Sequence, residues 1–138
     1  PGVETQMPIM LTQVNAGRAT LNQYVQWSAV APAKAWGCYP RKGLIAPGSD
    51  ADIAIVDMDH TTKISRDALH SKSHMTPWHG FETTGRVVHT LVRGRVVVRD
   101  GTLVGKPGWG RPVVQEMPEP NPRNTDKTTA AITAYRPD

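Results

Sequence analysis

The chain has 138 residues, of which 38% are hydrophobic, 20% charged and 6% aromatic, and its formal net charge is +4. This length fits one domain of ordinary size but excludes a complete (β/α)8 barrel, which takes about 250 residues. No stretch approaches the ~20 apolar residues of a membrane span, and no signal-peptide pattern opens the chain, so we expect a cytoplasmic protein without membrane association. The single cysteine excludes an intramolecular disulfide.

The first predicted elements are helices. Apolar residues recur near the helical period of 3.6 over residues 3–14, and residues 15–17 interrupt that pattern. Thr20 and Gln23 then have the spacing of a capping box, in which each side chain bonds the backbone N–H of the other. A second helix is therefore expected to begin near Leu21.

A further short helical turn is predicted after the second helix. Pro32 is suited to the first turn of a helix, and Gly37 is placed to end it in the left-handed conformation. Trp27 and Trp36 are expected to be core or helix-packing residues. Residues 3–37 are thus predicted to be helical with short breaks.

Short strands separated by turn residues are predicted over residues 43–104. The apolar run at 53–56 suits a strand covered on both faces, and Arg93-Gly94 and Asp100-Gly101 are typical hairpin turns. One helical turn is expected at 65–69. The predicted strands are 44–45, 53–56, 86–92, 95–99 and 102–104, and 71–85 is predicted to be a polar loop.

The last part of the chain, residues 105–138, is rich in proline and poor in large apolar residues. Such a segment buries too little surface to offset the entropy lost on ordering. It is predicted to be an extended or disordered tail, at least beyond Glu116.

Basic residues gather on and after the later predicted strands, which is compatible with binding of nucleic acid. Arginines alternate with valines there, but no aromatic stacking pattern accompanies them, so a solvated strand face is expected in preference to a nucleic-acid surface. The residues are Arg86, Arg93, Arg95, Arg99, Lys106 and Arg111.

Three constellations are the candidates for chemistry. His70 and His74 have an i, i+4 spacing, but the segment HSKSH lacks the glutamate of a zinc-protease motif and is loop-like. Cys38 is a nucleophile only if a histidine base lies beside it, and otherwise a small buried residue. Asp50 and Asp52 are either a carboxylate pair for acid–base catalysis or structural residues of a turn and a strand start. The structural interpretation is favoured for each.

Four segments in unbroken order resemble the C-terminal part of the cyclic amidohydrolases. They are PGVET at 1–5, VAPAKAWG at 30–37, YPRKGLIAPGSDADIAIVD at 39–57 and LHSKSHMTPWHGFETTGRVVHTLVRGRVVVRDG at 69–101. The element KG-x-x-x-PG-x-DAD is typical of the whole amidohydrolase superfamily. The pieces HSKS and TPW-x-G narrow the resemblance to the group that includes dihydroorotase, allantoinase, hydantoinase and dihydropyrimidinase.

The resemblance implies an α/β fragment in three parts. Residues 1–41 would be closing helices of a metal-dependent (β/α)8 barrel, residues 42–104 the C-terminal strands of a small composite β-sandwich, and residues 105–138 an extended tail. It also implies that Pro1 and Gly2 end a loop that touches the bound ring, which makes them the substrate-binding candidates. The family's metal ligands and catalytic aspartate precede the PGVET element, so no catalytic or metal residue is expected here.

The intact enzyme is then expected to use zinc or another divalent metal, to hydrolyse a ring C–N amide bond of a cyclic amide or ureide, and to be a homo-oligomer. Its missing partner would be an N-terminal barrel segment of the same or another chain. We expect the present chain alone to bind no metal and to be inactive. A separate non-catalytic subunit and an independent binding module that uses the arginine-rich strands are the alternatives.

Overall fold

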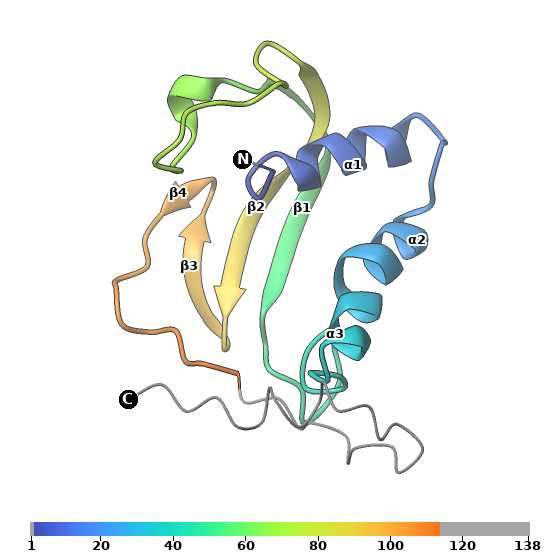
Figure 1. Ribbon diagram of the computed structural model, residues 1–138, viewed down its shortest axis with the longest axis vertical. Coiled ribbons are helices and arrows are strands. Elements are labelled where there is room, and N and C mark those ends of the chain that lie inside the picture. The colour runs from blue at the N-terminus through green and yellow to red at the C-terminus, as the bar shows by residue number, and fades with distance from the viewer. Residues whose placement is uncertain (1, 114–138) are drawn as a thin grey trace, which may run out of the picture.

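The computed structural model describes residues 2–113, and the predicted tail beyond Val113 and the candidate Pro1 lie outside this part. The strands of this part form one antiparallel sheet in which they lie side by side in chain order; the first helix packs on one face of the sheet, and the later helical stretch lies beside its edge (Figure 1). The elements are α1 (Gln6–Asn15), α2 (Leu21–Val25), the π-helix η1 (Gln26–Val30), α3 (Ala31–Ala35), β1 (Ile53–Lys63), the 3-10 helix η2 (Arg66–Ala68), β2 (Glu82–Val92), β3 (Arg95–Arg99) and β4 (Thr102–Leu103).

The predicted capping box is confirmed. The Thr20 hydroxyl accepts a hydrogen bond from the Gln23 N–H at 3.1 Å, and the Gln23 side chain accepts from the Thr20 N–H at 2.8 Å. From Leu21 the chain runs without interruption through α2, η1 and α3, so the two predicted helical segments are one. The wide π turn ends at Val30, two residues before Pro32, which has no N–H to continue the α-helical ladder.

The expectation that Trp27 and Trp36 are packed is wrong for the described part of the chain. Their side chains are 55% and 69% exposed, and Leu21 and Val25 on the same helical stretch are exposed as well. The buried residues of this stretch are Tyr24 and Ala33. This leaves an apolar helix surface open, which we call the 21–36 surface after its residues.

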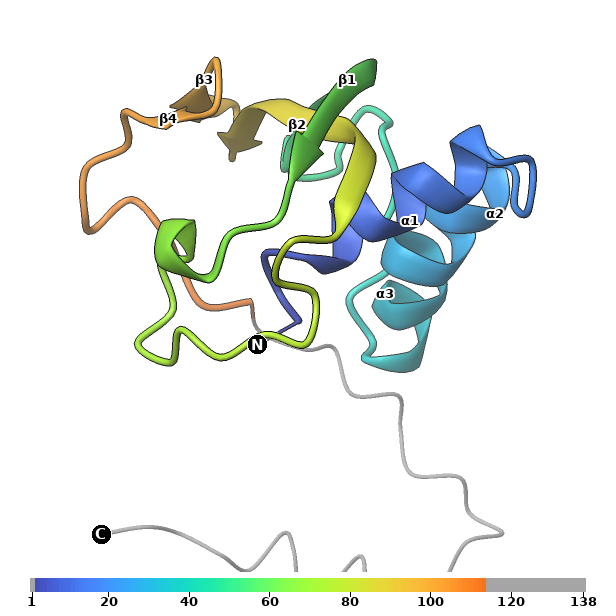
Figure 2. The same cartoon turned by 90° about the horizontal axis from the view of Figure 1, so that it is seen from above.

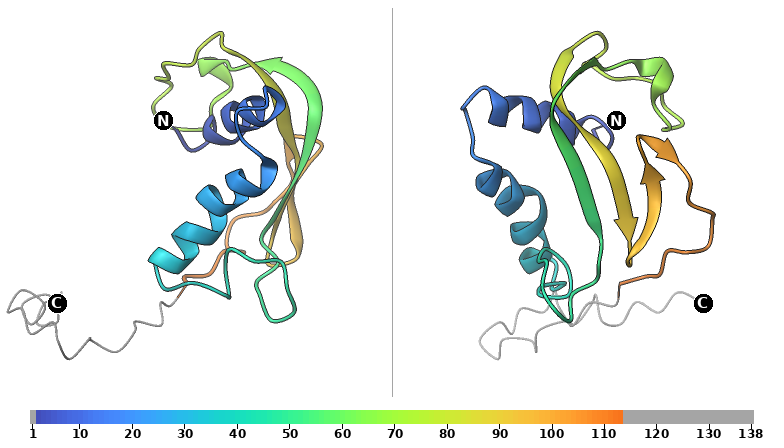
Figure 3. Two further views of the ribbon diagram at one scale, coloured as in Figure 1. Left: turned by 90° about the vertical axis from the view of Figure 1, so that its right-hand side faces the viewer. Right: turned by 180° about the vertical axis from the view of Figure 1, so that it is seen from behind.

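The first helix packs closely on the sheet at one point (Figures 2 and 3). Leu11 of α1 is completely buried against Gly85 of β2, and a Cβ atom on Gly85 would lie 2.7 Å from the Leu11 Cβ. Gly85 also has φ +108°, a conformation that other residues rarely adopt. The absence of a side chain at this position therefore permits the helix to approach the strand.

Hydrogen bonds also join α1 to the two strands beside it. The Thr84 N–H donates to the Thr12 hydroxyl at 2.9 Å, while the Asn15 amide donates to the carbonyls of Thr84 (3.0 Å) and Met58 (2.8 Å). The register of β1 against β2 is irregular between Asp57 and Thr61, beside the carbonyl that Asn15 reaches. The end of α1 thus satisfies backbone groups that an irregular ladder leaves free.

Several strand boundaries differ from the prediction. Residues 44–45 form no strand, and Ile45 is 81% exposed. β1 continues to Lys63, and Ile55 is 46% exposed, so this strand is not covered on both faces by the described residues. β2 begins at Glu82, inside the predicted 71–85 loop. The residues after Val56 are polar, so the sequence pattern does not indicate that the strand continues. They are in a strand because their backbone pairs with β2.

The two hairpin turns are confirmed. Arg93 and Gly94 have φ of 49° and 76°, and Asp100 and Gly101 have φ of 50° and 73°. Positive φ at both central residues defines the turn whose twist matches the flanking strands. Helices followed by an antiparallel sheet agree with the α/β fragment expected. None of the helices in the described part is long and apolar enough to cross a membrane.

Candidate functional site

The N-terminal segment and the connection between β1 and β2 meet at one place, which makes it the candidate site. The Glu4 carboxylate accepts hydrogen bonds from the backbone N–H of His70 (3.0 Å) and of Ser71 (3.1 Å), and it lies 2.9 Å from Nδ1 of His70. The hydrogen bond from the His70 N–H, followed by that from its ring, lowers the pKa of the Glu4 carboxyl below its ordinary value. Glu4 is therefore anionic at neutral pH and joins two segments far apart in sequence.

The connection between β1 and β2, residues 64–81, is closed at its base by backbone hydrogen bonds. The Ile64 N–H donates to the Phe81 carbonyl, and the Gly80 N–H donates to the Ile64 carbonyl. Two histidines then bond the backbone of Arg66: its N–H donates to Nδ1 of His79 at 3.2 Å, and its carbonyl lies 3.2 Å from Nδ1 of His74. We call this segment the 64–81 loop.

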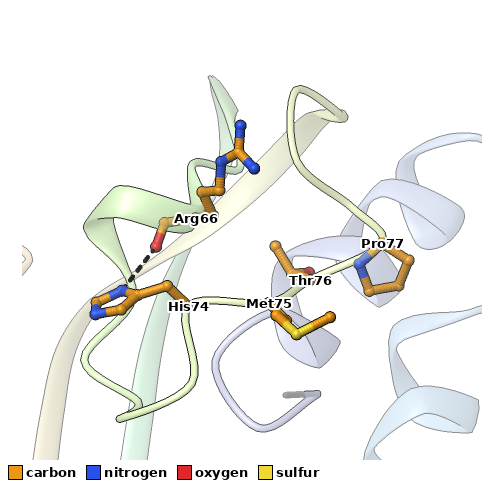
Figure 4. A pocket seen from close by; sticks show the side chains of 5 residues that line it. All are labelled: Arg66, His74, Met75, Thr76 and Pro77. Carbon is orange, nitrogen blue, oxygen red and sulfur yellow. Dashed lines mark hydrogen bonds between the residues drawn. The ribbon is translucent and has the colours of Figure 1, made fainter.

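An open hollow of about 420 Å³ lies on the 64–81 loop (Figure 4). Arg66 comes from η2, and the other lining residues come from the facing part of the same loop. The residues that line it are Arg66, His74, Met75, Thr76 and Pro77. With an arginine and a histidine beside a methionine, the hollow is suited to bind a ligand that has both polar and apolar parts.

Gly2, the described member of the predicted substrate-binding pair, lies at the start of this arrangement. It is exposed, and its carbonyl accepts a hydrogen bond from the Gln6 N–H at 2.9 Å in the turn that leads into α1. Its position is two residues from Glu4, and so the loop that the resemblance assigns to substrate is tied to the 64–81 loop. Sequence reasoning missed Glu4, although the PGVET element contains it.

The other candidates have structural contacts. His70 faces Glu4 while His74 faces the Arg66 carbonyl, so these two rings do not form a pair. Cys38 is half-buried, not fully buried, and its thiol donates to the Trp36 carbonyl at 3.3 Å. Within residues 2–113 no three histidine, cysteine, aspartate or glutamate side chains converge as a metal ion requires. The donor set of the described residues therefore does not fit the metal centre that the family resemblance implies.

Asp50 and Asp52 share the ammonium group of Lys42. Lys42 Nζ lies 2.9 Å from Asp50 and also pairs with Asp52, whose second oxygen accepts from the Arg93 N–H at 2.7 Å. The hydrogen bond from Lys42 lowers the pKa of Asp50. Burial raises the pKa of Asp52, but its hydrogen bonds with Lys42 and Arg93 outweigh that effect and lower it. Asp52 thus fastens the segment before β1 to the β2–β3 turn, while Asp50 holds Lys42 and Arg41 within the preceding loop, and both roles are structural, as the structural interpretation expects.

Two of the arginines on the strands contact an aromatic ring. The guanidinium groups of Arg93 and Arg95 lie 5.4 and 5.1 Å from the centroid of Trp109, and the Trp109 indole N–H donates to the Val92 carbonyl at 2.6 Å. A third, Arg86, lies 4.0 Å from Asp57. These arginines make contacts within the protein, so the prediction of a solvated strand face holds only in part.

Known proteins resemble this chain over most of its described length. The sequence profile described as "Amidohydrolase family" matches residues 2–97. The D-phenylhydantoinase of Escherichia coli O1:K1 / APEC is 40% identical over 112 residues, which are 80% of this chain and 24% of that enzyme. The D-phenylhydantoinase of Escherichia coli strain K12 / DH10B is 41% identical over the same length.

Solved structures agree with the sequence comparison. A D-hydantoinase structure superimposes with a TM-score of 0.76 at 39% identity and covers 80% of this chain and 24% of its own. The L-hydantoinase (dihydropyrimidinase) from Arthrobacter aurescens gives a TM-score of 0.74 at 42% identity, with 76% and 24% covered. The chain therefore spans about a quarter of the length of these relatives.

Proposed function

Because this chain belongs to the amidohydrolase family, we propose that it forms the C-terminal part of a hydantoinase-like cyclic amidohydrolase. The observation that carries the proposal is the 40% identity with D-phenylhydantoinase over 112 residues, a stretch that is only 24% of that enzyme. The substrate class is a cyclic amide or ureide. Its hydrolysis adds water across one ring C–N bond, so that the carbonyl carbon becomes a carboxylate and the ring nitrogen gains a proton.

The proposed role of the described residues is to complete and support a catalytic domain. Residues 2–41 would close the (β/α)8 barrel, and residues 42–104 would add strands to a composite β-sandwich. The exposed apolar side chains of the 21–36 surface support this proposal, because apolar helix faces normally pack against another element. The N-terminal barrel segment is the proposed occupant.

Gly2, together with Pro1, is proposed to present backbone groups to the substrate ring. Enzymes of this family are metal-dependent, and zinc or another divalent metal would supply the activated water. The donors of residues 2–113 do not fit such a centre, so we place the ligands and the catalytic carboxylate in the preceding part of the enzyme and propose that this chain alone is inactive. The complete enzyme would be a cytoplasmic homo-oligomer.

A chimeric enzyme tests this function. The matched quarter of Escherichia coli D-phenylhydantoinase is replaced by the present chain, and ring opening of a hydantoin is measured with the metal-loaded protein. We expect turnover by the chimera and none by the bacterial enzyme from which that quarter is deleted. A chimera that folds and assembles like the parent enzyme but has no activity would contradict the proposal.

A further inference from the structure

We infer that Glu4 is a positioning residue that holds the 64–81 loop against the segment carrying Gly2. The inference concerns a contact between residues 4 and 70–71, which the structure describes directly. Its consequence for turnover rests on the proposed function, in which Gly2 meets the substrate. No catalytic role is assigned to Glu4, because its carboxylate is engaged by the loop.

Three donors converge on this one carboxylate. The N–H groups of His70 and Ser71 are consecutive, and each lies 3.0–3.1 Å from Oε1 of Glu4, while the His70 N–H and its ring Nδ1 lie 3.1 and 2.9 Å from Oε2. Hydrogen bonds to an ionised acceptor are about twice as strong as those between neutral groups. Glu4 can therefore order a loop that has no regular secondary structure after η2.

Glu4 is also the point where hydrogen bonds attach this loop to the rest of the described molecule. The other hydrogen bonds of residues 65–77 remain within the 64–81 loop, such as those of Arg66 with His74 and His79. In the described part of the chain, the hydrogen bonds from residues 65–77 to residues outside the loop all end on Glu4. Its loss should therefore release the outer part of the loop while leaving the base closed.

The hollow depends on this attachment. Three of its lining residues, Met75, Thr76 and Pro77, follow His70 and Ser71 on the outer part of the loop. If Glu4 no longer fixes the loop, the wall that these side chains form shifts relative to Gly2. Since the proposed function places the substrate ring at Gly2, a loop that shifts relative to Gly2 should weaken the fit of substrate in the active enzyme, seen as a rise in KM, with little change in kcat because the reacting groups are untouched.

Nuclear magnetic resonance of the complete 138-residue chain tests the contact without any activity. In the wild type, the amide proton shifts of His70 and Ser71 should follow the titration of Glu4 with a midpoint below the ordinary glutamate pKa. Glu4→Gln should abolish that titration and speed hydrogen exchange at both amides roughly tenfold, the low end for a hydrogen bond to a charged group. Glu4→Asp retains the charge and should keep part of the titration. Glu82→Gln, which removes an exposed carboxylate on β2, is the matched control and should change neither amide.

Kinetics of the chimera separate the two proposals. We expect Glu4→Gln to raise KM several-fold and to leave kcat within about twofold. An inactive chimera whose His70 and Ser71 amides still titrate with Glu4 would remove the proposed function and leave the contact standing. The inference would be overturned if the amide shifts of His70 and Ser71 did not change as the Glu4 carboxylate titrates. Equal hydrogen exchange at these amides in Glu4→Gln and wild type would also overturn it, whether or not the chimera is active.

Discussion

Two helical regions of this molecule are stabilised in different ways. α1 packs a completely buried Leu11 on Gly85 and bonds the strands through Thr12 and Asn15. The stretch that begins at Leu21 has a complete capping box but leaves most of its large apolar side chains exposed. α1 is held mainly by packing on the sheet, whereas in the later stretch only Tyr24 and Ala33 are buried and the capping box fixes where the helix begins. Since short isolated helices are marginal in water, the second region needs a further partner to be equally stable.

The largest effect is expected from Leu11→Ala. Removing a fully buried leucine loses its burial and leaves a cavity, so the free energy of unfolding should fall by about 3 kcal/mol. Denaturant unfolding measures this effect. Val3→Ala removes a side chain that is almost fully exposed and is the matched control. Equal effects of the two substitutions would show that Leu11 does not belong to the packed core.

Gly85→Ala should be the next most destabilising change, by about 2 kcal/mol, because the new methyl group overlaps the Leu11 side chain. Gly17→Ala is the matched control, since Gly17 also has a positive φ but open space around it. The difference between the two variants in denaturant unfolding isolates the steric contribution. A Gly85→Ala protein as stable as Gly17→Ala would show that α1 does not approach β2 so closely.

Thr20→Ala removes the cap of the later helical stretch. We expect a loss of about 1 kcal/mol, because the Gln23 N–H loses its acceptor. Thr20→Ser keeps the hydroxyl and should retain most of the stability. Circular dichroism during thermal unfolding distinguishes these variants, and a Thr20→Ala protein that melts like wild type would mean that packing already determines where this helix begins.

Acid should weaken the attachment of the loop before β1 to the β2–β3 turn. The pKa of Asp52 is lower in the folded protein, so its stabilising contribution is present above the ordinary aspartate pKa and is lost as pH falls through the folded value. Asp52→Asn should therefore flatten the decrease of Tm below about pH 5. Asp59→Asn, an exposed aspartate of β1, should leave that decrease as it is in the wild type. If Asp59→Asn flattened the decrease of Tm and Asp52→Asn did not, Asp52 would not be the group that makes this attachment sensitive to acid.

The smallest effect on the chain itself is expected from Trp27→Ser. An exposed side chain contributes little to folding, so stability should change by no more than about 0.5 kcal/mol. In the chimera the same substitution should be clearly destabilising, because the 21–36 surface would then be covered by the barrel. Equal small effects in both proteins would contradict the proposed occupant of this surface.

Features that depend on residues close together in the sequence could be predicted from it. The capping box at Thr20 and Gln23 and the hairpin turns at Arg93-Gly94 and Asp100-Gly101 are confirmed. The extension of β1 was not, since Asp57, Asp59 and the threonines after them have no clear strand pattern and pair only because β2 is alongside. The same limit explains the tryptophans: hydrophobicity predicts that a side chain will be buried, but not whether the partner lies in the same stretch of chain.

The candidate site shows this limit most clearly. The family resemblance pointed to Gly2 through the PGVET element, but nothing local indicates that Glu4 meets the N–H groups of His70 and Ser71, 66 and 67 residues away in sequence. The structural role of Asp50 was favoured from its place in a turn, and that of Asp52 from its place at the start of a strand. Their common partner Lys42 was not foreseen, because a loop must fold back to bring its ammonium group to both.

We propose that this stretch supports a hydrolytic site and does not itself carry the reaction. The most direct measurement is metal content together with hydantoin turnover for the pure 138-residue chain, after incubation with zinc and removal of unbound ions. We expect metal far below one ion per chain and no ring opening. One firmly retained ion per chain with metal-dependent turnover, in a preparation free of other hydrolases, would contradict it.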